Sequence, residues 1–313
     1  MPFTMLLPTT IPLNFEVPNG VVLARYAVDE PVPQELAGAE ALVVWGNSRD
    51  QLRDTARRLT ALRWVATLAA GPDAVLDAGF GPQVVITSGR SLHDGPVAEH
   101  TLALVLAAAR RLHLLARAQQ DHRWAGELGG LQPAQPGSWR TLAGAHVLVW
   151  GFGSIAASLA PHLRLLGALV TGVAHTAGER AGFPVIAAAD VAAALPETDV
   201  LIAILPATGN AHAISAERLA LLPAHAWVVN VGRGSTLDEA ALLTALRAGR
   251  LGGAALDVFE TEPLPTDSPL WDEPNVIISP HAAGGRPVNP AGLVADNLAA
   301  LLAGRPLRNV VAR

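Results

Sequence analysis

The sequence predicts an α/β protein of two domains, each built on a parallel sheet. The chain has 313 residues, which is enough for two domains of ordinary size. Short apolar runs typical of buried strands alternate with helix-like stretches along most of its length. A glycine turn at 151–156 lies between such a strand and such a helix. Parallel strands need crossover helices of this kind, so the pattern favours β-α-β units.

The first part of the chain has this rhythm. Strands are predicted at 41–46, 63–71 and 83–89, with a helix at 49–61. From Pro96 to Gln120 an apolar-periodic stretch predicts one long helix, because proline is tolerated in a first helical turn. Residues 121–140 contain several glycines, two prolines and two tryptophans, Trp124 and Trp139, which indicates a loop or arm.

The rest of the chain continues with α/β units. A strand, the glycine turn, a helix and a second strand fill 146–175, and further strands are predicted at 199–206, 227–234, 252–259 and 275–280. Helices are predicted at 238–249 and 287–304. We place the last helix against the first domain, which makes that domain discontinuous. The fold class is therefore two Rossmann-like or flavodoxin-like domains with parallel sheets.

Composition excludes several classes of protein. The chain has no cysteine, which excludes disulfides, thiolate metal ligands and cysteine nucleophiles. Its histidines lack the spacing of a metal site. A net charge of -5 without a basic stripe argues against a nucleic-acid partner. No apolar run reaches the roughly 18 residues of a membrane span, and the N-terminus lacks the basic start of a signal peptide. We therefore expect a cytoplasmic protein that does not enter a membrane.

The glycine turn predicts a dinucleotide site. Gly151 permits a tight turn, and Gly153 lets a pyrophosphate approach the backbone. The helix that begins at Ser154 and Ile155 offers free N–H groups and the positive end of its dipole. Such a motif also occurs as an ordinary turn in α/β proteins. Its place between a strand and a helix is what gives it weight.

The end of the next strand bears on the choice between NAD(H) and NADP(H). An acidic residue normally stands there, roughly 20 residues after the motif, and binds the ribose 2′-OH. Here Ala174, His175 and Thr176 occupy the strand end. Without a carboxylate to repel a 2′-phosphate, and with His175, Thr176 and Arg180 as donors, we expect NADP(H) to be favoured and NAD(H) to be possible. Alternatively, His175 is a solvated loop residue and discrimination is weak.

Several long motifs resemble the D-isomer-specific 2-hydroxyacid dehydrogenase family over nearly the whole chain. They include VAEHTLALVLAAAR (97–110), NVGRGSTLDEAAL (230–242), ALDVFETEPLP (255–265) and SPLWDEPNVIISPHAAG (268–284). The resemblance implies a substrate domain of residues 1–95 with 286–313, a dinucleotide-binding domain of residues 96–285, and an active site in the cleft between them.

The resemblance also implies roles for single residues. The backbone N–H groups of Ala70 and Gly71 would bind the substrate carboxylate. The residues near the dinucleotide would be Thr101, Leu205, Pro206, Val231, Asp257 and Gly284, with Thr101 and Asp257 beside the nicotinamide. Two positions depart from the family pattern. Pro72 removes an N–H donor from the substrate loop, and Gly209 with Asn210 replaces a proline–acid pair.

Three residues in these motifs suit the reduction of a 2-oxo acid. The planar guanidinium of Arg233 can bind the substrate carboxylate and polarise its carbonyl. His281 can protonate the alkoxide, because the ordinary histidine pKa is near 6.5. Glu262 would hydrogen-bond the other imidazole nitrogen, and a nearby carboxylate generally raises a histidine pKa. Glu260 is the nearest rival for this role, but the family motif places the partner just before Pro263. His100, beside Glu99, is read as mainly structural.

We therefore expect an NAD(P)-dependent oxidoreductase that reduces a small 2-oxo acid, of the glyoxylate or hydroxypyruvate type, to the D-2-hydroxy acid. A phosphoglycerate- or phosphonate-type dehydrogenase is an alternative, as is a dinucleotide-sensing corepressor without enzymatic activity. In the family the segment around 121–140 packs across a dimer, so a homodimer is expected, with Trp124 and Trp139 as candidate anchors. Packing of these tryptophans within their own domain is the alternative.

Overall fold

The computed structural model describes residues 2–129 and 139–312, which form two compact units. One unit is Met1–His93 with Arg286–Arg313, and the other is Asp94–Gly285. The predicted arm at 121–140 therefore lies partly outside the described residues.

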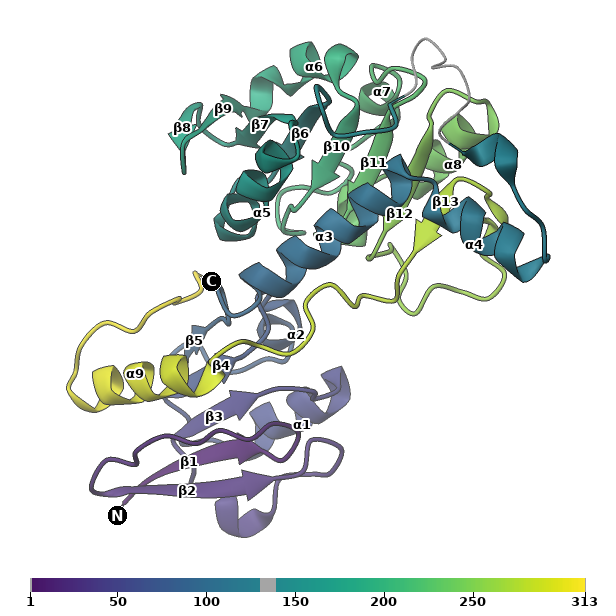
Figure 1. The fold of residues 1–313 in the computed structure, drawn as a ribbon. Coiled ribbons are helices and arrows are strands. Elements are labelled where there is room, and N and C mark those ends of the chain that lie inside the picture. Colours follow the sequence, from purple (N-terminus) through teal and green to yellow (C-terminus); the bar gives the residue numbers. More distant parts are fainter. Residues whose placement is uncertain (1, 130–138, 313) are drawn as a thin grey trace. The chain divides into compact units, whose positions relative to one another are not determined.

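The first unit is a parallel sheet with helices on both faces (Figure 1). Its strands follow the order β2-β1-β3-β4-β5, which is a doubly wound, flavodoxin-like order. Apolar side chains of β1, β3 and β4 pack against Val294 and Leu298 of α9, which explains why the end of the chain belongs to this unit. The elements are β1 (Phe3–Pro8), β2 (Val21–Tyr26), β3 (Ala41–Val44), α1 (Arg49–Arg58), β4 (Trp64–Thr67), α2 (Asp73–Leu76), β5 (Val85–Thr87) and α9 (Pro290–Leu302).

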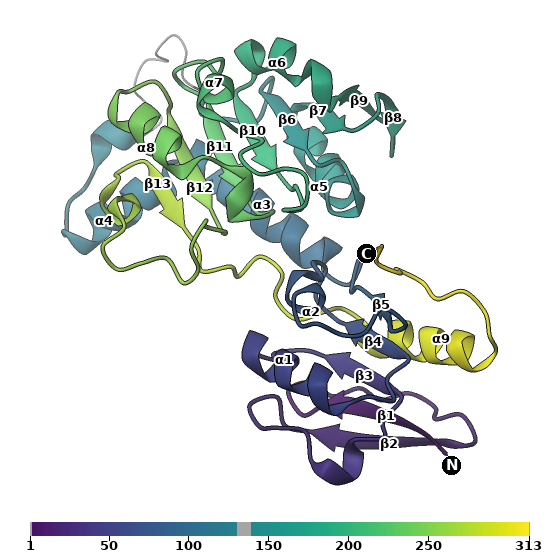
Figure 2. The ribbon, with the colours of Figure 1, turned by 180° about the vertical axis from the view of Figure 1, so that it is seen from behind.

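The second unit contains a larger sheet of order β13-β12-β11-β10-β6-β7-β9-β8, in which only β8 is antiparallel. Helices α3 and α5 pack on one face, and α6, α7 and α8 on the other (Figure 2). The helices are α3 (Asp94–Ala109), α4 (Leu112–Gln120), α5 (Ser154–Leu165), α6 (Val191–Ala194), α7 (Ala216–Leu219) and α8 (Glu239–Arg247). The strands are β6 (His146–Trp150), β7 (Leu169–Ala174), β8 (Gly178–Arg180), β9 (Phe183–Ala187), β10 (Val200–Ala203), β11 (Trp227–Asn230), β12 (Gly253–Leu256) and β13 (Val276–Ile278).

The predicted fold class, α/β with parallel sheets, is confirmed, but the single long helix predicted from Pro96 to Gln120 is wrong. The chain turns at Arg111, whose φ of 53° is left-handed, so that α3 and α4 are separate helices. The turn brings His113 against the edge of the Trp227 ring and buries Ala118. The hairpin of β8 and β9 was not predicted as separate strands. In the described residues, no helix is long and apolar enough to span a bilayer.

Candidate active site

The second sheet brings the three predicted catalytic residues and the glycine turn to one edge. Strands β6, β10, β11, β12 and β13 run parallel, and their last residues are in register: Trp150 pairs with Ala203, Ala203 with Asn230, Asn230 with Leu256, and Leu256 with Ile278. The five following loops therefore leave the sheet side by side. They carry the glycine turn, the segment 204–210, Arg233, Glu262 and His281.

The glycine turn lies where the sheet changes winding direction, between β6 and β10. Gly151 has a φ of 100°, and a Cβ there would lie 2.4 Å from the Ile204 carbonyl oxygen, so only glycine fits. At Gly153 a Cβ would meet nothing within 4 Å, which leaves the backbone open to a ligand. Ser154 begins α5 directly after this opening. Carboxyl ends of strands at such a switch point are where open α/β sheets bind ligands.

A cavity of about 310 Å³ opens beside this turn. It is lined by the ends of β6, β7 and β10, including Gly153, Ala174, His175, Leu205 and Pro206. The Arg180 side chain reaches the cavity from β8, and donates to the Phe152 carbonyl at 3.3 Å and to Thr176 Oγ1 at 3.1 Å. His175 lines the cavity, Thr176 follows it in the chain, and both are exposed. The cavity thus has a fixed guanidinium and no carboxylate at the position where a ribose-binding acid normally stands.

His281 and Glu262 are in direct contact. The His281 Nδ1 atom lies 2.7 Å from Glu262 Oε2, with 48% and 35% of the two side chains exposed. The second carboxylate oxygen of Glu262 accepts the Phe259 backbone N–H at 3.0 Å, which orients the carboxylate. A proton on Nδ1 satisfies the carboxylate, so Nε2 is the ring nitrogen available for proton transfer.

Arg233 is held on the neighbouring loop by its backbone. Its carbonyl oxygen accepts from Asn230 Nδ2 at 3.1 Å and from Thr236 Oγ1 at 2.6 Å, and its Nη1 donates to the Gly232 carbonyl at 2.7 Å. A Cβ on Gly234 would lie 1.9 Å from the Phe259 carbonyl carbon. The Arg233 loop therefore packs directly on the segment that donates to Glu262, which links the three predicted catalytic residues at one sheet edge. Asn230 and Thr236 were not singled out from the sequence.

Asp257 braces the loop that carries His281. It is 1% exposed, and its carboxylate accepts from Ser279 Oγ at 2.6 Å, from Ala282 N at 2.8 Å and from Ala283 N at 3.0 Å. The His281 N–H donates to the Asp257 carbonyl oxygen at 2.8 Å. In this conformation both carboxylate oxygens of Asp257 serve the protein backbone and Ser279. The family resemblance implies that Asp257 lies beside the nicotinamide, and this placement stays a prediction.

Glu260, the rival acid, points to a different set of partners. Its carboxylate accepts from His212 Nε2 at 3.1 Å and from the Glu239 backbone N–H at 3.3 Å. The Glu239 carboxylate accepts the Glu260 N–H at 2.6 Å in return. Burial raises the pKa of the Glu239 carboxyl; the hydrogen bond from Glu260 lowers it, while the nearby Glu260 and Glu262 charges raise it. This reciprocal pair fixes the start of α8 to the loop of Glu262.

The other predicted residues differ in how accessible they are. Thr101 is fully buried and donates to the Val97 carbonyl at 2.6 Å, and Leu205 and Val231 are each 7% exposed. The exposed or half-exposed ones are Ser154, Ile155, Pro206 and Gly284. In the first unit, Ala70 and Gly71 lie in the loop before α2, and their N–H groups make no hydrogen bond with the described part of the chain. No group of side chains able to hold a metal ion occurs among the described residues.

A sheet of this order with a glycine turn at its switch point is the architecture of a dinucleotide-binding domain. The family model "D-isomer specific 2-hydroxyacid dehydrogenase, NAD binding domain" matches residues 102–283. A glyoxylate/hydroxypyruvate reductase B of Pectobacterium atrosepticum is 32% identical over 293 residues, covering 91% of this chain and 88% of the relative.

Solved structures give the same result. A D-isomer specific 2-hydroxyacid dehydrogenase family protein from Aeromonas salmonicida matches with a TM-score of 0.82 and 30% identity over 99% of both chains. An NADPH-dependent glyoxylate/hydroxypyruvate reductase from Sinorhizobium meliloti, solved with NADP and sulfate, matches with a TM-score of 0.81 and 28% identity over 99% of this chain and 98% of that one. The chain belongs to the D-isomer specific 2-hydroxyacid dehydrogenase family, and the predicted family and enzyme class are confirmed.

Proposed function

We propose that this protein reduces a small 2-oxo acid, of the glyoxylate or hydroxypyruvate type, to the D-2-hydroxy acid, with NADPH as the favoured cofactor. The observation that carries the proposal is the His281–Glu262 pair, whose nitrogen and oxygen are 2.7 Å apart, on the same sheet edge as Arg233 and the glycine turn. Relatives with the same architecture are named glyoxylate/hydroxypyruvate reductases, which supports this substrate class.

The cavity beside the glycine turn fits a dinucleotide. Gly153 and the start of α5 would hold the pyrophosphate through backbone N–H groups. Arg180, with His175 and Thr176, would bind the 2′-phosphate, because Ala174 places no carboxylate there to repel it. NADH lacks that phosphate and would bind with less gain from Arg180. When bound, the reduced cofactor supplies the hydride for the carbonyl carbon of the substrate.

The residues of the chain would do the remaining work. Arg233 would bind the substrate carboxylate and polarise its C2 carbonyl, while Ala70 and Gly71 would add backbone N–H donors to the carboxylate. His281 would transfer a proton from Nε2 to the carbonyl oxygen as hydride adds to carbon. Glu262 would stabilise the imidazolium before the transfer and keep Nδ1 protonated afterwards. General acid catalysis of this kind typically contributes about 10²–10⁴-fold.

A substrate panel tests the proposal. Oxidation of NADPH and of NADH is followed with glyoxylate, hydroxypyruvate, pyruvate and phosphohydroxypyruvate, and reduction of NAD(P)⁺ is followed with phosphite. We expect turnover with the small 2-oxo acids and a higher kcat/KM with NADPH. A His281→Asn variant should lose kcat by orders of magnitude and keep its dinucleotide affinity. Tight dinucleotide binding without turnover of any substrate would instead favour a binding protein of the corepressor kind.

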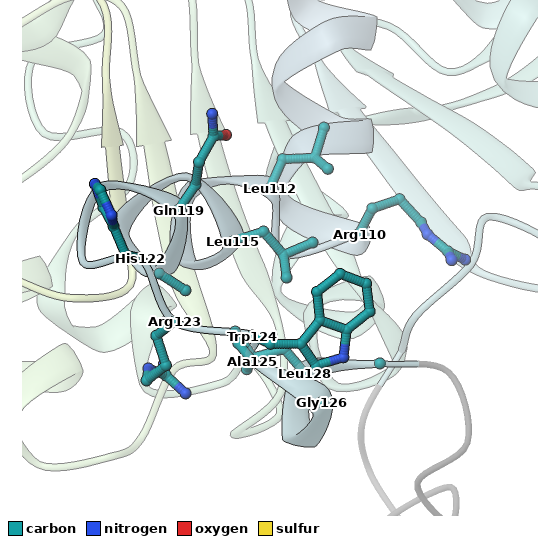
Figure 3. Close-up of a pocket in the computed structure, with 12 residues that line it drawn as sticks. Arg110, Leu112, Leu115, Gln119, His122, Arg123, Trp124, Ala125, Gly126 and Leu128 are labelled. Atoms are coloured by element: carbon teal, nitrogen blue, oxygen red, sulfur yellow. The ribbon is translucent and has the colours of Figure 1, made fainter.

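A homodimer and a cytoplasmic location belong to the same proposal. A groove of about 890 Å³ runs between α4 and residues 122–129 (Figure 3). Leu112, Leu115 and Trp124 line it with 50%, 37% and 97% exposed, so a second copy of the chain would cover a costly apolar surface. Trp139 packs instead against the core of its own unit. Trp124→Ser should weaken the dimer in sedimentation velocity; a wild-type monomer at micromolar concentration would contradict the assembly.

A further inference from the structure

We infer that His100 is a positioning residue for His281, acting through Ser279 and Asp257; the inference rests on the proposed function. His100 lies on α3, and its Nε2 atom is 2.9 Å from Ser279 Oγ and 3.4 Å from Asp257 Oδ1. Ser279 follows β13 and is two residues before His281. The contact joins two elements that are 179 residues apart in the chain.

The direction of each hydrogen bond follows from the number of protons available. The ionised Asp257 carboxylate only accepts, so the 2.6 Å contact uses the single Ser279 hydroxyl proton. The Ser279 oxygen then has only lone pairs to offer His100, and the His100 Nε2 atom must carry a proton. Donation therefore runs in one direction, from His100 to Ser279 to Asp257. Neutral His100 is consequently the Nε2–H tautomer.

The chain of donors ends on the groups that shape the His281 loop. Asp257 takes the N–H groups of Ala282 and Ala283, which directly follow His281, and its carbonyl takes the His281 N–H. His281 itself has a φ of 50°, in the left-handed region. A non-glycine residue stays in that region when its surroundings over-determine it, because the conformation has a cost. The Asp257 carboxylate accepts three hydrogen bonds, one from the Ser279 hydroxyl and two from backbone N–H groups. His100 orients the Ser279 hydroxyl.

This arrangement separates two roles on the same loop. Glu262 contacts the His281 ring and keeps its Nδ1 proton, whereas His100 contacts Ser279 and Asp257. Ser279 contacts the Asp257 carboxylate and, through its carbonyl oxygen, the His281 backbone N–H at 3.1 Å. Loss of the brace should therefore reduce the fraction of His281 rings that are aligned for proton transfer. Cofactor affinity should change little, because His100 and Ser279 do not line the cavity beside the glycine turn. We therefore expect variants of His100 and Ser279 to have a lower kcat and a nearly unchanged Kd for NADPH.

The test is a double-mutant cycle in NADPH-dependent reduction of glyoxylate, with His100→Leu, Ser279→Ala and the double variant. His100→Leu removes one neutral hydrogen bond and is expected to lower kcat by about 3- to 10-fold. Ser279→Ala also removes the hydrogen bond to the Asp257 carboxylate and should lower kcat by at least as much. The double variant should be no slower than the slower single variant, because both changes break one chain of donors. His100→Gln should restore kcat to within about twofold, since its amide N–H₂ can replace the Nε2 donor.

Matched measurements separate this role from general damage to the fold. His113→Leu removes another partly buried histidine, on α4 and outside the brace, and should leave kcat unchanged at pH 7. Nitrogen-15 NMR of the histidine rings should show a protonated His100 Nε2. Ser279→Ala removes only a hydroxyl group, so its kcat tests the inference even if the His100→Leu protein does not fold. Wild-type kcat in Ser279→Ala, multiplicative losses in the cycle, or an unprotonated Nε2 would each overturn the inference, whereas an inactive wild-type enzyme would instead overturn the proposed function.

Discussion

Replacement of Glu262 by glutamine tests the acid assignment most directly. The variant keeps the size of the side chain and an oxygen to accept the Phe259 N–H. It replaces the carboxylate that faces His281 Nδ1 at 2.7 Å with an uncharged amide. The imidazolium then loses its counter-charge, and an amide N–H₂ turned toward Nδ1 cannot accept the Nδ1 proton, which disfavours the doubly protonated ring that donates from Nε2. The loss should therefore appear in the proton-transfer step.

The size of the loss follows from the geometry. A hydrogen bond to a charged group contributes about 1.5–3 kcal/mol. Because 48% of the His281 side chain and 35% of the Glu262 side chain are exposed, solvent screens part of the attraction and the lower half of that range applies. At about 1.4 kcal/mol per factor of ten, kcat should fall roughly 10- to 50-fold.

The matched control is Glu260→Gln, two residues away on the same loop. Glu260 contacts His212 and the start of α8, so its variant should keep kcat within about threefold of wild type. The kcat of each variant is measured from the steady-state oxidation of NADPH with glyoxylate between pH 5.5 and 9. The affinity of each variant for NADPH is measured by fluorescence titration. Equal losses in the two variants would mean that general loop damage explains the effect. An unchanged Glu262→Gln enzyme would refute the pairing outright.

Three further predictions follow from single contacts. Arg180→Ala should lower kcat/KM for NADPH by about 10- to 100-fold and leave kcat/KM for NADH nearly unchanged, since only NADPH has the 2′-phosphate. Equal losses with the two cofactors would show that Arg180 does not bind the 2′-phosphate. Arg233→Lys keeps the charge but loses the planar fork, so kcat/KM for glyoxylate should fall at least tenfold; normal kinetics would contradict its role. Burial, then the Arg117 charge, lowers the pKa of His113 to about 4. The unfolded chain therefore binds the proton more strongly, and stability is lost as pH falls from 6.5 toward 4; with solvent screening this is about 1 kcal/mol between pH 7 and 5. Urea unfolding of His113→Leu should show a flatter pH dependence, and an unchanged slope would exclude His113 as its source.

Local patterns were enough to predict most of the second sheet. The strand at 146–150 is short, almost wholly apolar and followed by Gly151, so both its type and its carboxyl end could be predicted from the sequence. The strand predicted at 227–234 is of the right type but ends earlier, at Asn230. Parallel pairing then places Gly151 and Arg233 at one edge. The contact between Glu262 and His281 follows from the same logic, because adjacent strands precede them.

The sequence was a poorer guide where distant residues decide the local structure. The apolar period continues through Arg111, yet the chain turns there and His113 packs against Trp227, which lies 114 residues further along the chain. Arg180 reaches the cavity beside the glycine turn because β8 folds back on β9, a hairpin with weak strand signals. His100 and Ser279 are separated by 179 residues, and no spacing rule in one sequence connects them.

The same sheet edge holds the proposed reactive groups close to regular secondary structure. Asp257, Ser279 and the Arg233 loop each begin directly after a strand whose final residue is in register with its neighbour. Each reactive side chain is therefore only a few residues from a buried, hydrogen-bonded strand. Short connections of this kind limit the displacement of a guanidinium or an imidazole from its position in the site. A displacement of about 1 Å can lower the rate about 10²-fold. Substitutions in the braces at Asn230, Asp257 and Ser279 should therefore lower kcat even though none of them is assigned a step in the reaction.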